Sequence, residues 1–428
     1  MKRLFIFLAL ALPCVAEEPT TPRPLTLAQA QELALAQHPK ITVAALTALA
    51  SQQAVREVQA AALPNIFASA TAVGTADPGN TRIAAGGLNN PLIYERQADG
   101  VTISQLITDF GRSHELRRSA QATARSEQMN VQATRAQILL AVDQAYFAAL
   151  QSQSVLQVAE ETFRDRELVF GQTQALATNQ LKSQLDVSFA RVDYSQAGIL
   201  LAKARHDVAA SFANFSAVLG EPRPRAFVLA DEPVAPYVTN NSSALIFEAL
   251  ERRPDLSRLR YQRDAAREFA HAEGKLGYPV ISALGSAGLI PTGNSHLASD
   301  YAVAGVNLTL PIFTGGLNSA RRREAEYRAQ AAEAAVRDQE DMVARDVDIV
   351  ALDLDYAHER LALTQQLLEN AVDALELAQA RFKIGSTSII ELSQAELNKT
   401  SAQINAAAAR YDFQTEQSAL DFQLGRLH

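Results

Sequence analysis

An internal duplication constrains the fold of this chain more than any other feature of its sequence. Pro39 and Pro64 in the first half reappear as Pro254 and Pro279, a constant shift of 215 residues (254 − 39 and 279 − 64). Three later pairs share a shift of 205 residues: Val101 and Val306, Asp186 and Glu391, and Gly220 and Gly425. The first copy therefore has ten extra residues (215 − 205) between Pro64 and Val101. We expect each half to be one structural unit, with an exposed loop at that tolerant point.

The chain begins with the pattern of an export signal. Lys2 and Arg3 precede an apolar run, and small residues follow up to Ala16, where we expect cleavage. Lipid modification of Cys14 is the alternative. Cleavage would leave a formal charge near −10 (−8 − 2) and no thiol, since Cys14 is the only cysteine, and would exclude disulfides. The expected segments are a signal peptide at 1–16, a first repeat at 17–220, a connector at 221–242 that is either an ordered wrap or a linker, and a second repeat at 243–428, with both repeats in one intertwined domain.

The sequence limits how the chain could cross a membrane and whether it could bind nucleic acid. After the first residues, no segment has the ~18 unbroken apolar residues that a membrane-spanning helix needs, so a crossing of a membrane would have to use strands. The acidic balance argues against a nucleic-acid partner, whose phosphates attract a basic surface.

Each copy alternates helix and strand in the same order. A helix is expected first, broken at Pro39 in one copy and at Pro254 in the other. A pair of strands with turn residues between them follows, then a long helix, a tight turn and a return helix. The expected ranges are helices at 26–63 and 243–276, first strands at 65–76 and 280–289, return strands around 101–104 and 306–310, long helices after Gly111 and Gly316, and return helices at 183–219 and 388–424.

The return strands alternate apolar and small polar residues, which is typical of a barrel strand with lipid outside and water inside. The alternation equally suits a soluble sheet with one buried face. The register favours lipid, because matching positions of the two copies direct their apolar side chains the same way. Four strands are too few to close a pore, so other copies of the chain would have to complete the sheet. The expected lipid-facing residues are Val101, Ile103, Val306, Leu308 and Leu310.

The long helices have a heptad pattern, which predicts a left-handed coiled coil. A helix of about 60 residues would be on the order of 90 Å long. Leu185, Val192 and Ile199 in one return helix match Ile390, Leu397 and Ile404 in the other, and we expect them to pack against the long helices. The seam in the second copy consists of Val343, Val347, Val350, Leu354, Ala357, Leu361, Thr364, Leu368, Ala371, Leu375, Ala378 and Phe382; in the first copy it contains Ile138, Val142, Ala145, Ala149, Ser152, Leu156, Ala159, Phe163, Arg166 and Phe170.

None of the usual catalytic signatures occurs in the chain. The seven His residues are scattered without metal-ligand spacing, and neither a phosphate-binding Gly loop nor a nucleophile elbow is present. We therefore expect no enzyme activity, no cofactor and no metal.

The order of elements is similar to that of the outer membrane efflux protein family, the TolC-like channel tunnels. Two short sequence motifs also resemble the family. One is Arg253-Pro254-Asp255-Leu256, at the start of the second copy, and the other is Leu310-Pro311-Ile312-Phe313-Thr314-Gly315-Gly316, at the strand-to-helix junction. The resemblance implies a mainly α fold with a small β part. Duplicated units of helix, strand pair and long coiled hairpin would assemble as a homotrimer, with a twelve-stranded transmembrane barrel in outer-membrane lipid on a periplasmic helical barrel. A periplasmic adaptor and an inner-membrane transporter would be its partners.

The resemblance also assigns roles to the hairpin tips. Asp186 and Glu391 each follow a tip turn, where an acidic residue also suits the helix dipole. In the family, acidic residues at the matching positions surround the periplasmic entrance; in a trimer this pair would supply six carboxylates that favour cations. The family's pattern has a second acid at Gln394, a basic residue at Thr387 and a tyrosine at Phe382, so the closing network should differ here. The turns that we expect to dock an adaptor contain Asn179, Gln180, Leu181, Lys182, Lys383, Gly385 and Ser386.

One alternative from another class stays open on these patterns. A periplasmic adaptor or coiled-coil scaffold also has long helical hairpins, although adaptors normally interrupt one hairpin with a β-rich domain. Within the channel interpretation, drug efflux, metal export and type I secretion are all compatible with the sequence, because the inner-membrane partner delivers the cargo.

Overall fold

A computed structural model describes residues 24–73, 96–223, 227–234, 236–237, 242–292 and 299–427. The expected signal peptide and most of the expected extra loop lie outside these residues. The chain divides into two compact units, and each unit contains parts of both repeats. Unit 1 consists of residues up to 37, 141–237 and 356–415, and unit 2 of residues 38–140, 238–355 and 416–428.

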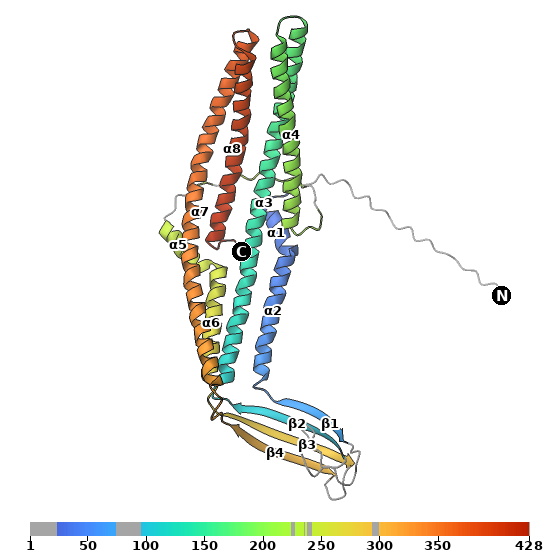
Figure 1. Ribbon diagram of the computed structural model, residues 1–428, viewed down its shortest axis with the longest axis vertical. Coiled ribbons are helices and arrows are strands. Elements are labelled where there is room, and N and C mark those ends of the chain that lie inside the picture. The colour runs from blue at the N-terminus through green and yellow to red at the C-terminus, as the bar shows by residue number, and fades with distance from the viewer. Residues whose placement is uncertain are drawn as a thin grey trace, which may run out of the picture. The chain divides into compact units, whose positions relative to one another are not determined.

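The predicted order of elements is confirmed in both copies (Figure 1). The long helices α3 and α7 have 67 residues each, and the return helices α4 and α8 have 35 each. The first copy contains α1 (Leu27–Gln37), α2 (Pro39–Ala60), β1 (Asn65–Val73), β2 (Arg96–Thr108), α3 (Arg112–Thr178) and α4 (Gln184–Val218). The second contains α5 (Ser242–Arg252), α6 (Pro254–Gly274), β3 (Val280–Thr292), β4 (Asp300–Thr309), α7 (Leu317–Lys383) and α8 (Ile389–Gln423).

The two prolines start helices as expected. Pro39 and Pro254 each occupy the first turn, where the missing N–H costs no hydrogen bond and the fixed φ suits the helix. His38 caps α2, since its Nδ1 accepts a hydrogen bond from the Lys40 amide at 3.2 Å. The breaks between α1 and α2 and between α5 and α6 therefore follow from local sequence.

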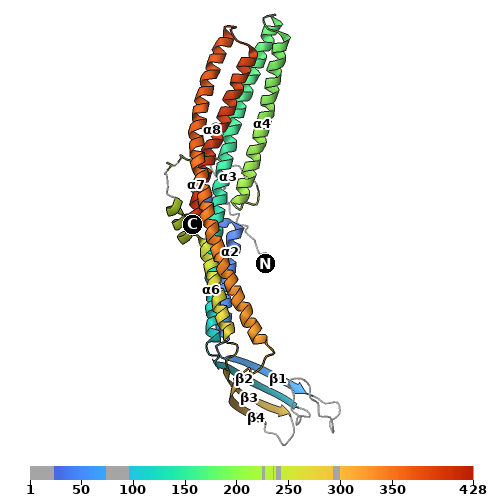
Figure 2. The same ribbon diagram turned by 60° about the vertical axis from the view of Figure 1, so that its left-hand side comes forward.

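Unit 2 contains one antiparallel sheet with the strand order β1-β2-β3-β4 (Figure 2). Its two faces differ in chemistry. Cross-strand partners Ala68 and Val101, and Ala283 and Val306, lie on one face. Thr102 and Ser286 are partners on the other face, where their hydroxyl oxygens are 3.2 Å apart. One face is thus mainly apolar and the other carries many hydroxyl groups, as period-two alternation predicts.

A buried carboxylate lies in unit 2 where the end of α6 meets the starts of α3 and α7. Glu273, near the end of α6, has a side chain that is only 2% exposed. Its oxygens lie 3.1 Å from Arg112 Nη2 and 2.8 Å from Arg321 Nε. Arg112 is the first residue of α3 and Arg321 is the fifth of α7, so Glu273 fixes the starts of both long helices against α6.

Unit 1 contains two helical hairpins, which α4 and α8 form with the C-terminal parts of α3 and α7 (Figure 1). Apolar contacts hold each hairpin together. Ala159 of α3 packs with Leu201 and Ala204 of α4, and Leu375 and Ala378 of α7 pack with Leu392 of α8. The predicted seams of α3 and α7 are confirmed. The buried seam positions are Ile138, Val142, Ala145, Ala149, Ala159, Arg166, Val343, Val347, Leu354, Ala357, Ala371, Leu375 and Ala378.

The return helices pack against the long helices as expected, but the residues predicted to make this contact were wrong. Leu185, Val192, Ile199, Ile390 and Leu397 are exposed in the single chain, and Ile404 is half-buried. The residues of α4 and α8 that are buried instead include Val187, Ala190, Ala197, Leu201, Ala204, Ile389, Leu392 and Ala402. The return helices have apolar residues on two faces, and the chain buries the face with smaller side chains against its own long helices. The seven-residue spacing identified the other face.

The described part of the connector is an ordered wrap. Leu229 forms a parallel bridge with Leu25, and the Leu25 amide donates to the Val228 carbonyl at 2.7 Å. The buried Tyr146 hydroxyl lies 2.9 Å from the Leu25 carbonyl oxygen and 2.6 Å from that of Ala230. One side chain of α3 therefore holds both the segment before α1 and the connector within unit 1.

None of the helices in the described part of the chain is both long and apolar enough to cross a membrane.

Candidate functional site: the hairpin tips and the sheet

Both hairpin tips end their long helices in the same way. Gln180 and Gly385, related by the shift of 205 (385 − 180), have positive φ values of 62° and 74°. The Leu181 amide donates to the Leu176 carbonyl at 2.9 Å, and the Ser386 amide donates to the Arg381 carbonyl at the same distance. This left-handed closure satisfies carbonyl groups that a helix end leaves free. The expected docking residues thus lie in two similar, ordered turns.

Asp186 takes part in the N-terminal cap of the return helix α4, whose N-cap residue is Ser183. Its carboxylate accepts hydrogen bonds from the Ser183 hydroxyl at 2.7 Å and from the Ser183 amide at 3.0 Å, while its own amide donates to Ser183 Oγ at 3.1 Å. This reciprocal pair is a capping box. The bonds from the Ser183 side chain and amide lower the pKa of Asp186. The carboxylate consequently stays charged throughout the neutral range.

Glu391 has different partners from its counterpart. Arg381 Nη1 lies 3.1 Å from Glu391 Oε1, and the Thr387 hydroxyl donates to the other carboxylate oxygen. The Glu391 amide also donates to Ser388 Oγ at 3.3 Å. The family's pattern has a basic residue where this chain has Thr387. Arg381 thus supplies a positive charge close to Glu391 from a different position.

The two tips are connected within unit 1 by a cation–π contact. The ammonium of Lys182, in the α3–α4 turn, lies 4.5 Å from the centre of the Phe382 ring near the end of α7. Such a contact at a partly exposed site contributes about 0.5–1 kcal/mol.

Gln394 lies one turn into α8, and its amide donates to Asn398 Oδ1 at 2.9 Å.

The structure brings some of the predicted tip residues together and leaves others apart. Thr387 contacts Glu391, and Lys182 contacts Phe382. In the described part of the chain, no hydrogen bond or ion pair joins Asp186 to Glu391. One residue was missed: Arg381, whose ion pair with Glu391 spans the turn. The available signal was a basic residue ten positions before Glu391, at the end of the long helix. Ile384, inside the second expected docking turn, is 79% exposed.

The expected lipid-facing residues have one property in common. Val101, Ile103, Val306 and Leu308 are all exposed, and the strand register places them on the apolar face of the sheet. Leu310 is exposed as well, but it lies one residue beyond the end of β4. The grouping on one face is observed, whereas contact with lipid stays a prediction.

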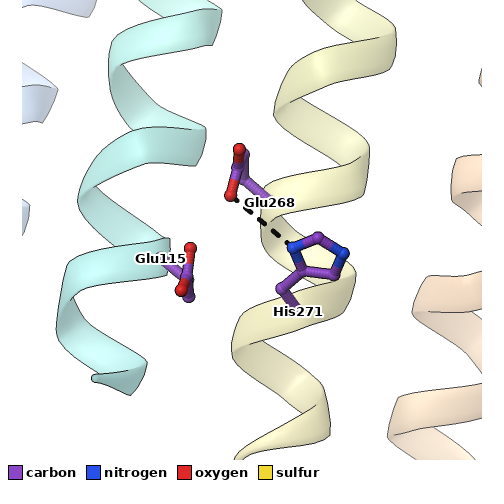
Figure 3. A group of neighbouring side chains, drawn as sticks. All are labelled: Glu115, Glu268 and His271. Carbon is purple, nitrogen blue, oxygen red and sulfur yellow. Dashed lines mark ion pairs between the residues drawn. The ribbon is translucent and has the colours of Figure 1, made fainter.

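A second cluster of ionisable groups lies between α3 and α6 in unit 2 (Figure 3). One potential ligand atom from each of Glu115, Glu268 and His271 lies within 4.8 Å of the others. Each carboxylate already has a cationic partner, because Lys275 lies 2.9 Å from Glu115 and Arg118 lies 2.6 Å from Glu268. A metal ion would meet those charges, so the cluster carries no metal assignment.

The carboxylates of this cluster have opposite shifts. The hydrogen bond from Lys275 lowers the pKa of Glu115, whereas burial raises the pKa of Glu268. On acidification, Glu268 therefore takes up a proton before Glu115.

Comparison with known proteins decides the family. The model of the outer membrane efflux protein family matches residues 30–221 and 245–426, one segment in each repeat. The chain belongs to this family. The expected resemblance, the outer-membrane location and the function class of a transport channel are confirmed, and the adaptor or scaffold alternative is set aside.

Two relatives are about one quarter identical to this chain over the aligned residues. It is 25% identical over 307 residues to the outer membrane protein TolC of Vibrio cholerae, covering 69% of each chain. It is 24% identical over 297 residues to the probable efflux pump outer membrane protein TtgC of Pseudomonas putida, covering 69% of this chain and 61% of the relative. The chain thus spans about two thirds of the length of these relatives.

Solved structures support the same fold. The CmeC outer membrane channel of Campylobacter jejuni superposes with a TM-score of 0.81 at 15% identity, over 99% of this chain and 94% of that one. A membrane protein from Pseudomonas aeruginosa gives a TM-score of 0.80 at 22% identity, over 93% and 92% of the two chains. The expected fold class, mainly helical with a small sheet, is confirmed.

Proposed function

We propose that three copies of this chain form a channel tunnel, in which their sheets close into one barrel across the outer membrane and their helices line a periplasmic passage. An inner-membrane transporter and a periplasmic adaptor would deliver the cargo, so this passage would serve either efflux or type I secretion. The channel itself would be passive. It would contribute the exit route and the entrance at the hairpin tips.

The open sheet is the observation that carries this proposal. Strands β1 and β4 are the edges of the four-stranded sheet that the structure describes. An unpaired edge in lipid leaves backbone N–H and C=O groups without partners, at a cost of several kcal/mol each. Pairing of β4 in one copy with β1 in the next removes both edges and gives an apolar outer face. Three sheets of four strands would give twelve strands, a number within the range of closed outer-membrane barrels.

The lipid contact of the sheet can be tested with tryptophan, because the natural chain has none. We expect Ile103→Trp to place an indole in the acyl chains, so that lipids brominated on those chains quench most of its fluorescence. Ser104→Trp is the matched control, since the neighbouring side chain lies on the opposite face. We expect little quenching for this variant. Equal quenching of both indoles in reconstituted protein would contradict the assigned face.

The docking role of the tips predicts a loss of transport without a loss of assembly. Leu181 is 70% exposed in the first tip turn, so Leu181→Asp should leave folding intact while it places a charge in the adaptor contact. We expect cells that carry the variant to become as sensitive to pump substrates as cells that lack the channel. Leu168→Asp, at an α3 residue that is 60% exposed, is the control and should preserve transport. Normal transport by the Leu181 variant, with normal trimers, would place docking elsewhere.

A further inference from the structure

Polar contacts join the two hairpins of unit 1 along α3 and α8. The Ser154 and Tyr411 hydroxyl oxygens are 3.3 Å apart, and those of Thr162 and Thr400 are 3.2 Å apart. One turn after Thr162, the guanidinium of Arg166 continues this row of contacts. The apolar contacts described above lie within each hairpin, between its two helices. They would be kept if each hairpin moved as a rigid pair of helices, whereas the polar contacts between the hairpins would break.

Arg166 lies at the centre of a buried charge network. Its Nη1 contacts a carboxylate oxygen of Glu396 on α8, and it lies 3.3 Å from Asp193 Oδ2 on α4. Its Nη2 donates to the Ser393 carbonyl at 3.3 Å, and the Ser393 hydroxyl donates to Asp193 Oδ2 at 2.6 Å. The side chains of Arg166 and Glu396 are 8% and 10% exposed. One arginine therefore connects three helices.

The network is absent from the equivalent place in the other repeat. The shift of 205 takes Arg166 to Ala371 and Asp193 to Asn398 (371 − 166 and 398 − 193). The counterpart of Glu396 in the first copy is Arg191 (396 − 205). The duplication kept the helices but did not keep these charges. The network is thus a local specialisation and does not follow from the repeat.

The charges of the network do not balance when both carboxylates are ionised. Arg166 supplies one positive charge, whereas Asp193 and Glu396 supply two negative charges. An uncompensated charge in a buried site is costly, and a bound proton removes it. Burial raises the pKa of Glu396, the effect of Arg166 opposes this, and the charges of Asp165 and Asp193 add to it.

Charged groups around Glu396 come from α3, α4 and α8. Helix α3 contributes Arg166 and Asp165, and α4 contributes Asp193. The nearby contact of α8 with α7 is apolar, since Leu375 and Ala378 pack with Leu392. On α8 itself, Lys399 lies one turn further along. With a proton on Glu396, Arg166 and Asp193 form a balanced pair.

We propose that this network is a proton-operated latch, which holds a proton on Glu396 while the two hairpins are packed together and loosens α8 from α3 and α4 when that proton leaves. The sign follows from linkage. A carboxyl with a raised pKa stabilises the packed arrangement at low pH, and this stabilisation is lost as the pH rises through the raised value. Acid therefore closes the latch. The effect on conductance rests on the proposed channel function, whereas the bound proton does not.

The proton can be observed directly by infrared spectroscopy of the detergent-solubilised protein. We expect the wild type to show the carbonyl band of a protonated carboxyl group that persists above the pH at which an ordinary Glu ionises and disappears as the pH is raised further. Glu396→Gln should lack this component, while Glu167→Gln, at an exposed residue beside Arg166, should retain it. An identical titration in wild type and Glu396→Gln would overturn the proposal.

The latch itself is tested by conductance across planar bilayers on both sides of that titration. We expect the wild type and Glu167→Gln to conduct more as the proton leaves, and Glu396→Gln to stay at the low level with this component of the pH profile lost. If the band titrates in the wild type but its conductance does not follow, the network binds a proton without acting as a latch. If no variant conducts at any pH, the channel function fails, and the infrared result still decides whether Glu396 holds the proton.

Discussion

Removing both arginines that surround Glu273 is expected to destabilise the protein by about 3–5 kcal/mol, the cost of leaving a buried carboxylate without a partner. In the double variant Arg112→Met with Arg321→Met, the aliphatic parts are retained but the 2%-exposed carboxylate loses both ion pairs. The starts of α3 and α7 lose their common attachment to α6 as well. Denaturant unfolding of the solubilised protein measures the loss.

Two further variants separate the charge effect from a loss of packing. Adding Glu273→Met to the double variant should recover a large part of the stability, because no buried charge is left unpaired. Glu326→Ala removes an exposed partner that lies 3.0 Å from Arg322, and it should cost no more than about 1 kcal/mol. A triple variant that is no more stable than the double variant would mean that the arginines act through packing.

Neutralising the tip acids is expected to remove most of the block of the channel by multivalent cations added on the periplasmic side. In Asp186→Asn with Glu391→Gln, the proposed trimer loses all six carboxylates that would surround its entrance. We expect the blocking concentration to rise at least about tenfold, equivalent to about 1.4 kcal/mol of binding free energy. Planar bilayer recordings measure this concentration directly.

The environment of these acids adds a pH expectation and a control. Because the bonds from Ser183 lower the pKa of Asp186, block of the wild type should persist into mildly acidic solution. The control is Asp373→Asn with Glu376→Gln, which removes the same charge from exposed positions of α7. Unchanged block in the tip variant, or equal loss in the control, would assign the block to other groups.

Local sequence was sufficient to predict the elements and the seams. Pro39 and Pro254 start helices because proline fixes φ. The seam from Val343 to Ala378 is buried or half-buried because its spacing keeps it on one side of α7. The pairing of apolar residues on one face of the sheet follows from the period of two. These features depend only on neighbours along the chain.

Contacts between distant elements could not be predicted in this way. Arg166 was assigned to the seam of α3, but its partners lie 27 and 230 residues away. Arg381 reaches Glu391 around a turn, and only the geometry of that turn brings them together. The return helices show the same limit, because a heptad identifies an apolar face without saying which neighbour covers it.

The equal lengths of corresponding helices restrict how such a chain can evolve. Both long helices have 67 residues and both return helices have 35, and both tips close on a left-handed residue. A deletion of one heptad from α3 alone would pull one tip back, shift the register with α4 and separate Lys182 from Phe382. A viable change of length needs matching deletions in all four helices. Related sequences should therefore have insertions and deletions in the loops far more often than in the hairpins.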